Sequence, residues 1–379
     1  MKFEKFVSGN WVKQYQYKSF QPALINQEWS WDDPRMNVLL EKATRALGEL
    51  NAFTLIVPDV DLFIRMHIIK EANTSSRIEG TRTEMDEAVL DEAAIRPERR
   101  DDWREVRNYV EAMNSAIEEL QRLPLSMRLL RRTHEILMAG ARGERKTPGE
   151  FRRSQNWIGG TSLADAAFIP PHHDTLPDLL TDLEAFWHND SIQVPHLVRC
   201  ALSHYQFETI HPFLDGNGRI GRLLITLYLV SHGLLSKPSL YLSAHLEKHR
   251  GAYYDALTRV RESNDIGHWV RFFLQAMIET AENGKQTFQR ILALRQEIDD
   301  LIVRLGRRAE KAHTLVRHLY QEPVVSVNQV TDLLGLKYYA ANQLVGAMAE
   351  AGILQEETGW QRNRLFAFRR YLNVFSDGN

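Results

Sequence analysis

The sequence has a single cysteine, Cys200, among its 379 residues, which excludes an intramolecular disulfide bond. One thiol suits a reducing compartment, and Cys200 falls in a predicted helix, where we expect it to serve packing. No apolar run approaches the roughly 18 residues that a membrane-spanning helix needs. Residues 1–6 lack the apolar stretch of a signal peptide. We therefore expect a cytoplasmic protein with no membrane partner.

The sequence also lacks an excess of charge of one sign. Lys and Arg number 47 against 49 Asp and Glu, so the net charge is −2. This balance gives no general argument for binding nucleic acid or a membrane. There is no internal repeat and no low-complexity linker, and the length exceeds that of one typical domain. We expect two or three folded units.

What the sequence does contain is a 12-residue segment rich in reactive groups, residues 211–222, which reads His-Pro-Phe-Leu-Asp-Gly-Asn-Gly-Arg-Ile-Gly-Arg. Residues 197–210 before it carry apolar side chains at helical spacing. Residues 220–230 after it are almost wholly apolar, which predicts a buried helix. The segment therefore lies on a turn between two helices, and Gly216, Asn217 and Gly218 lead into the second helix.

This placement favours anion binding at the start of the second helix. A helix N-terminus leaves backbone N–H groups unpaired and carries a partial positive charge. Glycines at 216 and 218 permit unusual backbone angles and a close approach by phosphate. Arg219 and Arg222 are three residues apart, so they share a helix face and can each grip phosphate oxygens.

Two further side chains suggest chemistry on that phosphate. Asp215 is a carboxylate beside an anion site, where it makes sense as a magnesium ligand. His211 lies one turn before the glycines, and imidazole is suited to act as a general base near neutral pH. The alternative reading of these residues is a surface cluster of ion pairs around an ordinary turn.

The segment resembles the complete signature of the Fic family, His-x-Phe-x-Asp/Glu-Gly-Asn-Gly-Arg-x-x-Arg. Fic proteins typically transfer AMP from ATP to a hydroxyl group of a target protein and release pyrophosphate. The resemblance implies that His211 takes the proton from the Ser, Thr or Tyr hydroxyl. It also implies that Asp215 holds Mg²⁺ between the α- and β-phosphates, and that Phe213 anchors the loop in the core.

The same resemblance assigns the phosphate contacts. Gly216, Asn217 and Gly218 are expected to form the anion hole around the α-phosphate. Arg219 is expected to hold the β-phosphate and Arg222 the γ-phosphate. The intact Gly-Asn-Gly argues against the branch of the family that phosphorylates its targets, so we expect nucleotidyl transfer, which depends on positioning and charge stabilisation.

A second motif qualifies this activity. Residues 75–80, Ser-Ser-Arg-Ile-Glu-Gly, fit the family's inhibitory pattern Ser/Thr-x-x-x-Glu-Gly/Asn. Residues 63–72 have helical spacing, so Ser75 and Glu79 are predicted to share a helix face one turn apart. The resemblance implies that Glu79 pairs with Arg222 and blocks the γ-phosphate position. It also implies that the inhibitory helix belongs to an N-terminal extension of the catalytic core. The alternative is a helix that simply ends at Gly80, with Glu79 in solvent.

Two other segments are candidates for substrate contacts. Residues 148–161 and 168–173 are bounded by Gly and Pro and predict a short β-hairpin. In Fic proteins this flap, here around 151–161, pairs with the backbone of the target. Tyr254 is a candidate for contacting adenine, with Arg261 two turns later, although helix packing is an equal reading. We expect no metal at His172 and His173.

We predict a mainly α fold, a Fic-type helical bundle with a β-hairpin flap followed by a C-terminal winged helix-turn-helix. The expected divisions are an N-terminal extension with the inhibitory helix (1–100), the Fic core (101–285), a helical connector (286–310) and the winged helix (311–379). The third helix of that last unit has one cation, Lys337, beside Tyr338, Asn342 and Gln343. It binds either DNA, with wing arginines on phosphates, or protein.

The sequence thus predicts an autoinhibited, ATP- and Mg²⁺-dependent protein adenylyltransferase. We expect it to modify a target protein and itself, and a homodimer is compatible with this. Two alternatives stay open. One is a DNA-binding regulator with a secondary Fic domain, and the other is an enzyme that removes AMP, with Glu79 positioning a water molecule.

Overall fold

The computed structural model describes residues 1–140, 146–359 and 364–376. Within these residues the fold is mainly helical, with one two-stranded and one three-stranded sheet. None of the described helices combines the length and the apolar character needed to cross a bilayer. For the described residues, the prediction of a mainly α protein is confirmed.

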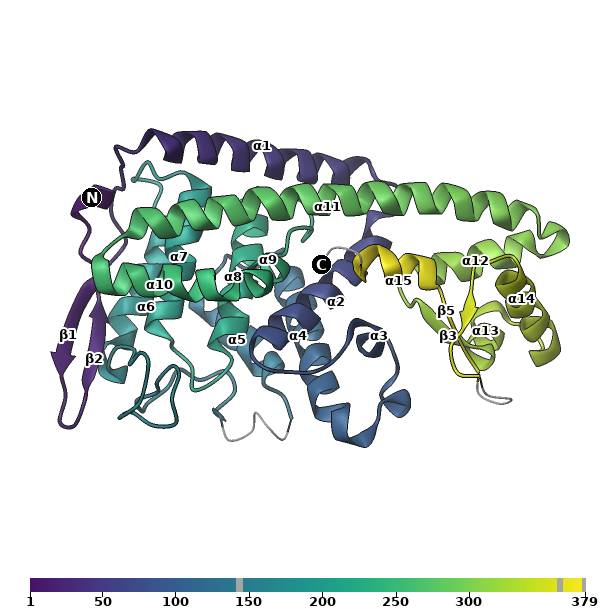
Figure 1. Ribbon diagram of the computed structural model, residues 1–379, viewed down its shortest axis with the longest axis horizontal. Coiled ribbons are helices and arrows are strands. Elements are labelled where there is room, and N and C mark those ends of the chain that lie inside the picture. Colours follow the sequence, from purple (N-terminus) through teal and green to yellow (C-terminus); the bar gives the residue numbers. More distant parts are fainter. Residues whose placement is uncertain (141–145, 360–363, 377–379) are drawn as a thin grey trace.

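Two long helices form one side of the molecule. They are α1 (Pro34–Ile56) and α11 (Ile266–Val303), and they run side by side along its length (Figure 1). The carboxylate of Asp33 begins α1 by accepting a hydrogen bond from the Arg35 N–H at 3.0 Å. At 1.5 Å per residue, α11 is about 57 Å long. The expected boundary at residue 285 falls inside α11.

Beneath this pair, a helical bundle surrounds α7 (His196–Ile210) and α8 (Asn217–Ser231). All of residues 197–210 are buried, although about half of them are apolar and the segment also carries buried polar and charged side chains such as Arg199, His204 and Glu208. The surrounding helices are α2 (Val60–Ile78), α3 (Met85–Ala88), α4 (Arg100–Glu119), α5 (Met127–Leu137), α6 (Leu176–His188), α9 (Ser243–Lys248) and α10 (Arg250–Ser263). The two helices predicted around the 211–222 turn are therefore present.

The sequence did not predict the small sheet near the N-terminus. Strands β1 (Gly9–Lys13) and β2 (Lys18–Pro22) pair antiparallel, with Gly9 opposite Pro22. The ring of Phe20 is buried and lies 5.7 Å from that of Phe168, and the Phe20 N–H donates to the Ile169 carbonyl at 2.9 Å. The strand β2 thereby borders the flap segment.

The flap segment is less regular than the predicted hairpin. Its only β pairing in the described residues is one bridge between Ile158 and Phe168, with backbone hydrogen bonds of 2.8 and 3.1 Å. Gly159 and Gly160 both have positive φ. The Asp165 carboxylate accepts hydrogen bonds from the backbone N–H groups of Thr161 and Ser162. A tight turn held by local hydrogen bonds takes the place of the two paired strands that were predicted. The prediction of a β-hairpin is therefore corrected to a single bridge closed by a turn.

The C-terminal part contains helices and a sheet in the predicted order. Its elements are α12 (Ala309–Leu319), β3 (Val324–Ser326), α13 (Val327–Leu334), α14 (Tyr338–Glu350), β4 (Gln355–Glu356), β5 (Leu365–Ala367) and α15 (Arg369–Ser376). The sheet is antiparallel in the order β3-β5-β4. Ser326 and Gln329 form a capping box at the start of α13, and Gly335 ends it at φ 62°. Assignment of this part as a winged helix stays a prediction.

The final helix was not predicted, and it joins the C-terminal part to the bundle. The Tyr371 ring packs 6.5 Å from that of Phe63, and the Phe375 ring lies 5.1 Å from that of His67. Phe63 and His67 both belong to α2. The helix that carries Ser75 is therefore covered by the end of the described chain.

Candidate active site

The segment 211–222 forms a tight loop between α7 and α8. His211 ends α7 in the left-handed region at φ 50°, and Gly216 turns into α8 at φ 74°. The Asn217 side chain holds the loop closed, because it accepts from the Phe213 N–H at 2.8 Å and donates to the Phe213 carbonyl at 2.9 Å. Phe213 is fully buried, and its ring stacks on that of His134 at 3.8 Å. Asn217 thus shapes the loop through its side chain.

A buried arginine that the sequence did not single out supports the loop from behind. Arg152 donates to the carbonyls of His211 at 2.9 Å and Pro171 at 2.6 Å. Asn156 donates to the carbonyls of His211 and Phe213 at 3.1 and 2.8 Å. Both residues come from the flap segment, so the flap and the loop are built as one unit. The only signal in the sequence for this supporting role was the presence of an arginine in a loop rich in Gly and Pro.

The environment of His211 keeps its imidazole neutral. Burial lowers its pKa to about 3, and the guanidinium groups of Arg152 and Arg261 act in the same direction. Its Nδ1 atom is buried and has no hydrogen-bond partner among the described residues. A neutral imidazole is the form that accepts a proton, so the site is compatible with a general base.

The structure brings Ser75, Glu79 and Arg222 together. Arg222 donates from Nε to the Ser75 hydroxyl at 2.8 Å and from Nη2 to the Ser75 carbonyl at 3.0 Å. The same Nη2 lies 2.6 Å from Oε1 of Glu79, which follows the last residue of α2. The side chain of Arg222 is 2% exposed and that of Glu79 is 37% exposed. Helix α2 does end just before Gly80, as the alternative reading expected, but Glu79 is paired with Arg222 and does not point freely into solvent.

Both groups of this ion pair are charged at neutral pH. Burial raises the pKa of the Glu79 carboxyl, but the Arg222 guanidinium outweighs this, and the pKa lies below its ordinary value. Burial lowers the pKa of Arg222, but the Glu79 carboxylate raises it above its usual range. Each charge therefore compensates the burial of the other.

The Glu79 carboxylate also covers the start of α8. A Cβ atom on Gly218 would clash with Oε1 of Glu79 and would lie 3.0 Å from Nη1 of Arg222. An acidic oxygen is therefore seated against the glycine that the sequence assigns to the anion hole. An anionic oxygen bound by Arg222 thus lies against the start of α8, which is the position that a phosphate oxygen would need.

The other two charged residues of the segment lie at the edge of this site. The Asp215 side chain is 50% exposed, and its Oδ1 accepts from the Gly216 N–H at 2.6 Å. Its outer position leaves room for a hydrated Mg²⁺, which keeps several water ligands. Arg219 is 6% exposed and pairs with Glu105 of α4 at 3.2 Å. In this structure Nη1 of Arg219 therefore already donates a hydrogen bond to a carboxylate oxygen of Glu105.

A second buried carboxylate, Glu208, was missed by the sequence interpretation. It lies on α7 three residues before His211 and is 7% exposed. Burial raises its pKa to about 7, although the positive charge of Arg222 acts in the opposite direction. Its Oε1 has no hydrogen-bond partner in the part of the chain that the structure describes. It packs under α8, where a Cβ on Gly221 would clash with it.

The predicted adenine contact, Tyr254, lies near the site on α10. Its side chain is 39% exposed, and Arg250 lies 5.7 Å from its ring centroid. Burial raises the pKa of its phenol, and the Glu79 charge contributes to the rise. Arg261 instead supports the end of α7, donating to the Thr209 hydroxyl at 3.3 Å. The structure therefore places Tyr254 beside the ion pair and Arg261 behind it.

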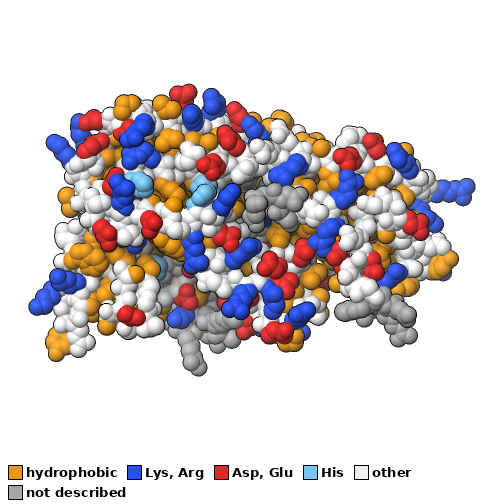
Figure 2. Space-filling model, viewed as in Figure 1, with side chains coloured by type: hydrophobic (Ala, Val, Ile, Leu, Met, Phe, Trp, Pro, Cys, Tyr) orange, Lys and Arg blue, Asp and Glu red, His pale blue; other side chains and the backbone are white. Residues whose placement is uncertain are grey.

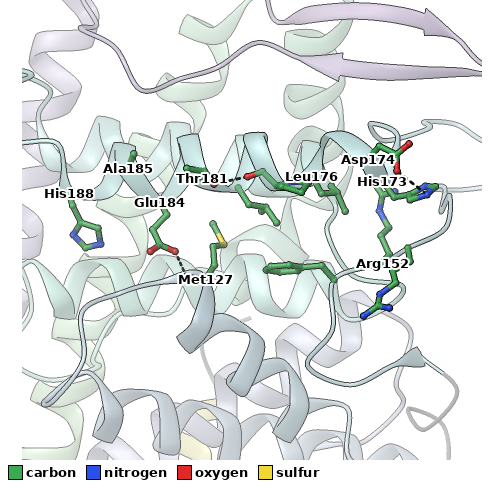
Figure 3. A pocket seen from close by; sticks show the side chains of 13 residues that line it. Met127, Arg152, His173, Asp174, Leu176, Thr181, Glu184, Ala185 and His188 are labelled. Carbon is green, nitrogen blue, oxygen red and sulfur yellow. Dashed lines mark hydrogen bonds and ion pairs between the residues drawn. The ribbon is translucent and has the colours of Figure 1, made fainter.

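A cavity of about 850 Å³ lies beside the flap (Figure 3). Its apolar lining includes Met127, Phe151, Leu176 and Leu180. In Figure 3, Glu184 and His188 lie at one end of the cavity and His173, Asp174 and Arg152 at the other, with Thr181 between them. Arg152 joins this cavity to the loop, because it lines the cavity and donates to the His211 carbonyl.

The sequence matches two models of one protein family. Residues 37–118 match the Fic/DOC family N-terminal model, and residues 124–229 match the Fic/DOC family model. Over 135 residues the chain is 36% identical to protein adenylyltransferase Fic of Culex quinquefasciatus and 34% identical to that of Drosophila melanogaster. Each match covers 35% of this chain, and the chain spans about a quarter of each relative, 24% and 25%.

Solved structures of Fic proteins share the fold. One from Desulfovibrio desulfuricans aligns with a TM-score of 0.56 at 21% identity, covering 90% of this chain and 98% of that one. Fic-1 of C. elegans aligns with a TM-score of 0.51 at 18% identity, covering 70% and 75%. These identities support the fold alone, a mainly helical Fic fold with small sheets. The sequence matches identify the chain, over residues 37–118 and 124–229, as a Fic/DOC family protein related to the protein adenylyltransferases named Fic.

Proposed function

We propose that this protein is an autoinhibited protein adenylyltransferase that modifies a Ser, Thr or Tyr hydroxyl of a target protein and of itself. The observation that carries the proposal is the seat of the Glu79 carboxylate, on Arg222 and against Gly218 of a complete signature segment. The residues that would receive the phosphates of ATP are assembled, and an acidic side chain of the same chain lies on them.

The proposed reaction is a single displacement at the α-phosphorus of ATP. The target hydroxyl oxygen forms a bond to that phosphorus, the bond to the β-phosphate oxygen breaks, and pyrophosphate leaves. His211, which is neutral, takes the hydroxyl proton. The backbone N–H groups at the start of α8 stabilise the added negative charge. Asp215 would hold Mg²⁺, which neutralises charge on the phosphates.

The resting state in this proposal is inactive. Arg222 already has three hydrogen bonds, to two atoms of Ser75 and to Glu79. A γ-phosphate would have to replace the Glu79 carboxylate against Arg222 and Gly218. Removing Glu79 leaves Ser75 to orient Arg222 and opens the anion site, so activity should rise.

The flap side of the site supports a protein substrate. The cavity in Figure 3 is bordered by Phe151 and Arg153 of the flap and has an apolar floor. An apolar side chain of a target segment that follows the flap would be buried there. The target protein itself is not identified by this surface.

The test compares AMP incorporation into the purified chain for wild type, Glu79→Gly and Glu79→Gln. We call Glu79→Gly the activated variant. Because the Glu79 side chain is partly exposed, we expect a gain of about ten- to a hundredfold for the activated variant, less than a fully buried pair would give. Glu79→Gln keeps the shape but loses the charge, so its gain should be intermediate.

His211→Ala in the activated background is the matched control and should abolish incorporation, measured by intact mass. Equal incorporation in wild type and the activated variant would overturn autoinhibition. Incorporation that survives His211→Ala would overturn the proposed base. Loss of AMP from labelled protein on adding wild type, but not the activated variant, would favour AMP removal as the main reaction.

The ion pairs of the C-terminal part argue against the DNA-binding alternative. Arg369 pairs with Glu357 and Asp86, and Arg370 pairs with Glu297, so these two cations are engaged within the chain. Arg364 donates to Asn342 at 2.8 Å, while Arg362 lies outside the described residues. Charges of both signs are interspersed over the face shown in Figure 2. A mobility-shift assay across salt concentrations tests DNA binding directly.

A further inference from the structure

Two histidines lie one helical turn apart where α9 packs against α11 (Figure 1). His245 and His249 are four residues apart, and the His249 N–H donates to the His245 carbonyl at 3.0 Å. The helical turn therefore continues between them, and the centroids of their rings lie 4.5 Å apart. Two histidines at this spacing share one face of a helix, which lets both imidazoles bind the same metal ion.

A carboxylate from the neighbouring helix completes a group of three ligands. Oε2 of Glu279, on α11, lies 3.3 Å from Nδ1 of His245. The ligand atoms of His245, His249 and Glu279 all lie within 4.8 Å of one another. Ligands around a tetrahedral zinc ion, with bonds of roughly 2.0–2.1 Å, lie about 3.3 Å apart. One pair is already at this separation, and a rotation of the exposed His249 imidazole brings the third ligand in.

Two of the three ligands are already oriented by their neighbours. The Gln275 amide donates to Oε1 of Glu279 at 2.8 Å, and this leaves Oε2 facing His245. The side chain of His245 is 10% exposed, and the centroid of its ring lies 6.0 Å from that of Phe272 on α11. Outer contacts of this kind fix the direction of metal ligands and strengthen binding.

The charges around the group leave an imidazole free to bind. Burial lowers the pKa of His245, the Glu279 carboxylate opposes this, and the charge of Lys248 acts in the same direction as burial. A neutral imidazole offers the lone pair that a metal ion needs. Lys248 repels a cation, but its side chain is exposed and carries its charge into solvent.

A second group of three, His172, His173 and Asp174, is a weaker candidate. Its ligand atoms are also within 4.8 Å of one another, but the three residues are consecutive in one loop. Nδ1 of His172 already accepts from the Asp174 N–H at 3.4 Å. A metal ion there would join no separate elements, whereas one at His245 would join α9 to α11.

We propose that His245, His249 and Glu279 form a binding site for Zn²⁺, separate from the nucleotide site. Two imidazoles and one carboxylate are the protein ligands of many zinc sites in which water takes the fourth position. Mg²⁺ and Ca²⁺ prefer oxygen ligands, so the two imidazoles select against them. Binding of Zn²⁺ does not depend on the proposed function.

The position of the site gives it a consequence for the helix that carries Ser75. Glu247, between the two histidines, has its Oε1 3.4 Å from Nε of Arg77, which lies two residues before Glu79. The Ser243 hydroxyl at the start of α9 donates to Glu71 of α2 at 2.5 Å. An ion that fixes α9 on α11 therefore also steadies α2 and favours the inhibitory position of Glu79. This second step rests on the proposed autoinhibition.

The test measures Zn²⁺ binding to the untagged full chain by calorimetry and by the shift in melting temperature. The chain is first stripped with a chelator and then kept in excess Mg²⁺, which occupies oxygen sites such as Asp215. We expect wild type to bind Zn²⁺ and to melt at a higher temperature with it. His249→Ala and Glu279→Gln should each weaken binding by at least about tenfold. Because His249 is exposed, its replacement should leave the fold intact.

Two control variants show whether the effect is specific. His313 is 49% exposed and pairs with Asp299 at 3.6 Å, but this pair belongs to no group of three ligands in the described part of the chain. His313→Ala should therefore bind Zn²⁺ like wild type, and so should His173→Ala. Binding of unchanged affinity in both His249→Ala and Glu279→Gln, or binding lost only in His173→Ala, would overturn the site.

The coupling to α2 has a separate readout, the hydrogen exchange of backbone amides in residues 75–80. Zn²⁺ should slow this exchange in wild type and leave it unchanged in His249→Ala. It should also lower AMP incorporation in wild type by a larger factor than in Glu79→Gly. Exchange that does not respond to Zn²⁺, with binding intact, would refute the coupling and leave the zinc site. If no variant incorporates AMP, the proposed function fails, while calorimetry still decides whether the site exists.

Discussion

Replacing Glu208 by Gln should change how the stability of the protein depends on pH. The Glu208 carboxyl is buried on α7 with one oxygen unpartnered, and burial raises its pKa from 4.5 to about 7. Gln has nearly the same shape but does not titrate. The variant therefore removes a proton-binding group while leaving the packing of α7 against α8 in place.

The sign and size of the effect follow from this rise in pKa. The folded protein holds the Glu208 proton more tightly than the unfolded chain, so its stabilisation is complete below pH 4.5 and is lost as pH rises through about 7. At about 1.4 kcal/mol per pH unit, the full loss is on the order of 3 kcal/mol. Relative to Glu208→Gln, the free energy of unfolding of wild type should fall by about 2–3 kcal/mol between pH 5 and 8.

Urea unfolding at pH 5, 6, 7 and 8, followed by tryptophan fluorescence and circular dichroism, measures this difference. Glu41→Gln, at an exposed position of α1, is the matched control and should follow wild type at every pH. Parallel pH profiles for wild type and Glu208→Gln would refute the argument, because they would mean that Glu208 is equally easy to ionise in the folded and unfolded chain.

Three other substitutions or treatments test particular contacts. Asn217→Ala loses both hydrogen bonds to the Phe213 backbone and should lower the free energy of unfolding, measured by urea unfolding, by about 2–3 kcal/mol. An unchanged free energy of unfolding would show that the loop closes without these hydrogen bonds. Cys200 is 1% exposed, so a thiol reagent should modify it only in denaturant, and rapid reaction of the native chain would contradict its burial. Arg152→Lys keeps the charge but not the fork of donors that reaches the His211 carbonyl. In the activated variant it should slow AMP incorporation at least tenfold in a time course, whereas an unchanged rate would show that one cation suffices.

The parts of the site that could be predicted from the sequence are those that are local. The helix before residues 211–222 follows from apolar residues at helical spacing, the helix after them from an almost continuous apolar sequence, and the turn from the glycines between the two. The contact between Glu79 and Arg222 spans 143 residues, and no periodicity reveals it. That contact was predicted only because the two segments resemble motifs that occur together in one family.

The parts that were missed depend on distant contacts or on weak local signals. Arg152 gains its role from carbonyls that lie 58 and 59 residues away, on Ile210 and His211. Glu208 looks like an exposed helical residue until α8 covers it. Strands of five residues such as β1 and β2, and a helix as short as α15, carry too little periodicity to be identified alone. Their formation depends on the surfaces that they cover.

The packing of α15 on α2 has a consequence for how the C-terminal part and the ion pair influence each other. Tyr371 and Phe375 of α15 pack against Phe63 and His67 in the earlier turns of α2, and Glu79 follows the last residue of that helix. Under the proposed function, a partner that binds the C-terminal part and shifts α15 would change the support of α2, and thermodynamic reciprocity would then require ATP binding to change the affinity for that partner by the same factor. The C-terminal helix and the Glu79–Arg222 ion pair therefore act on opposite ends of one helix, so that under the proposed function recognition by the C-terminal part would be reported as a change in nucleotide affinity.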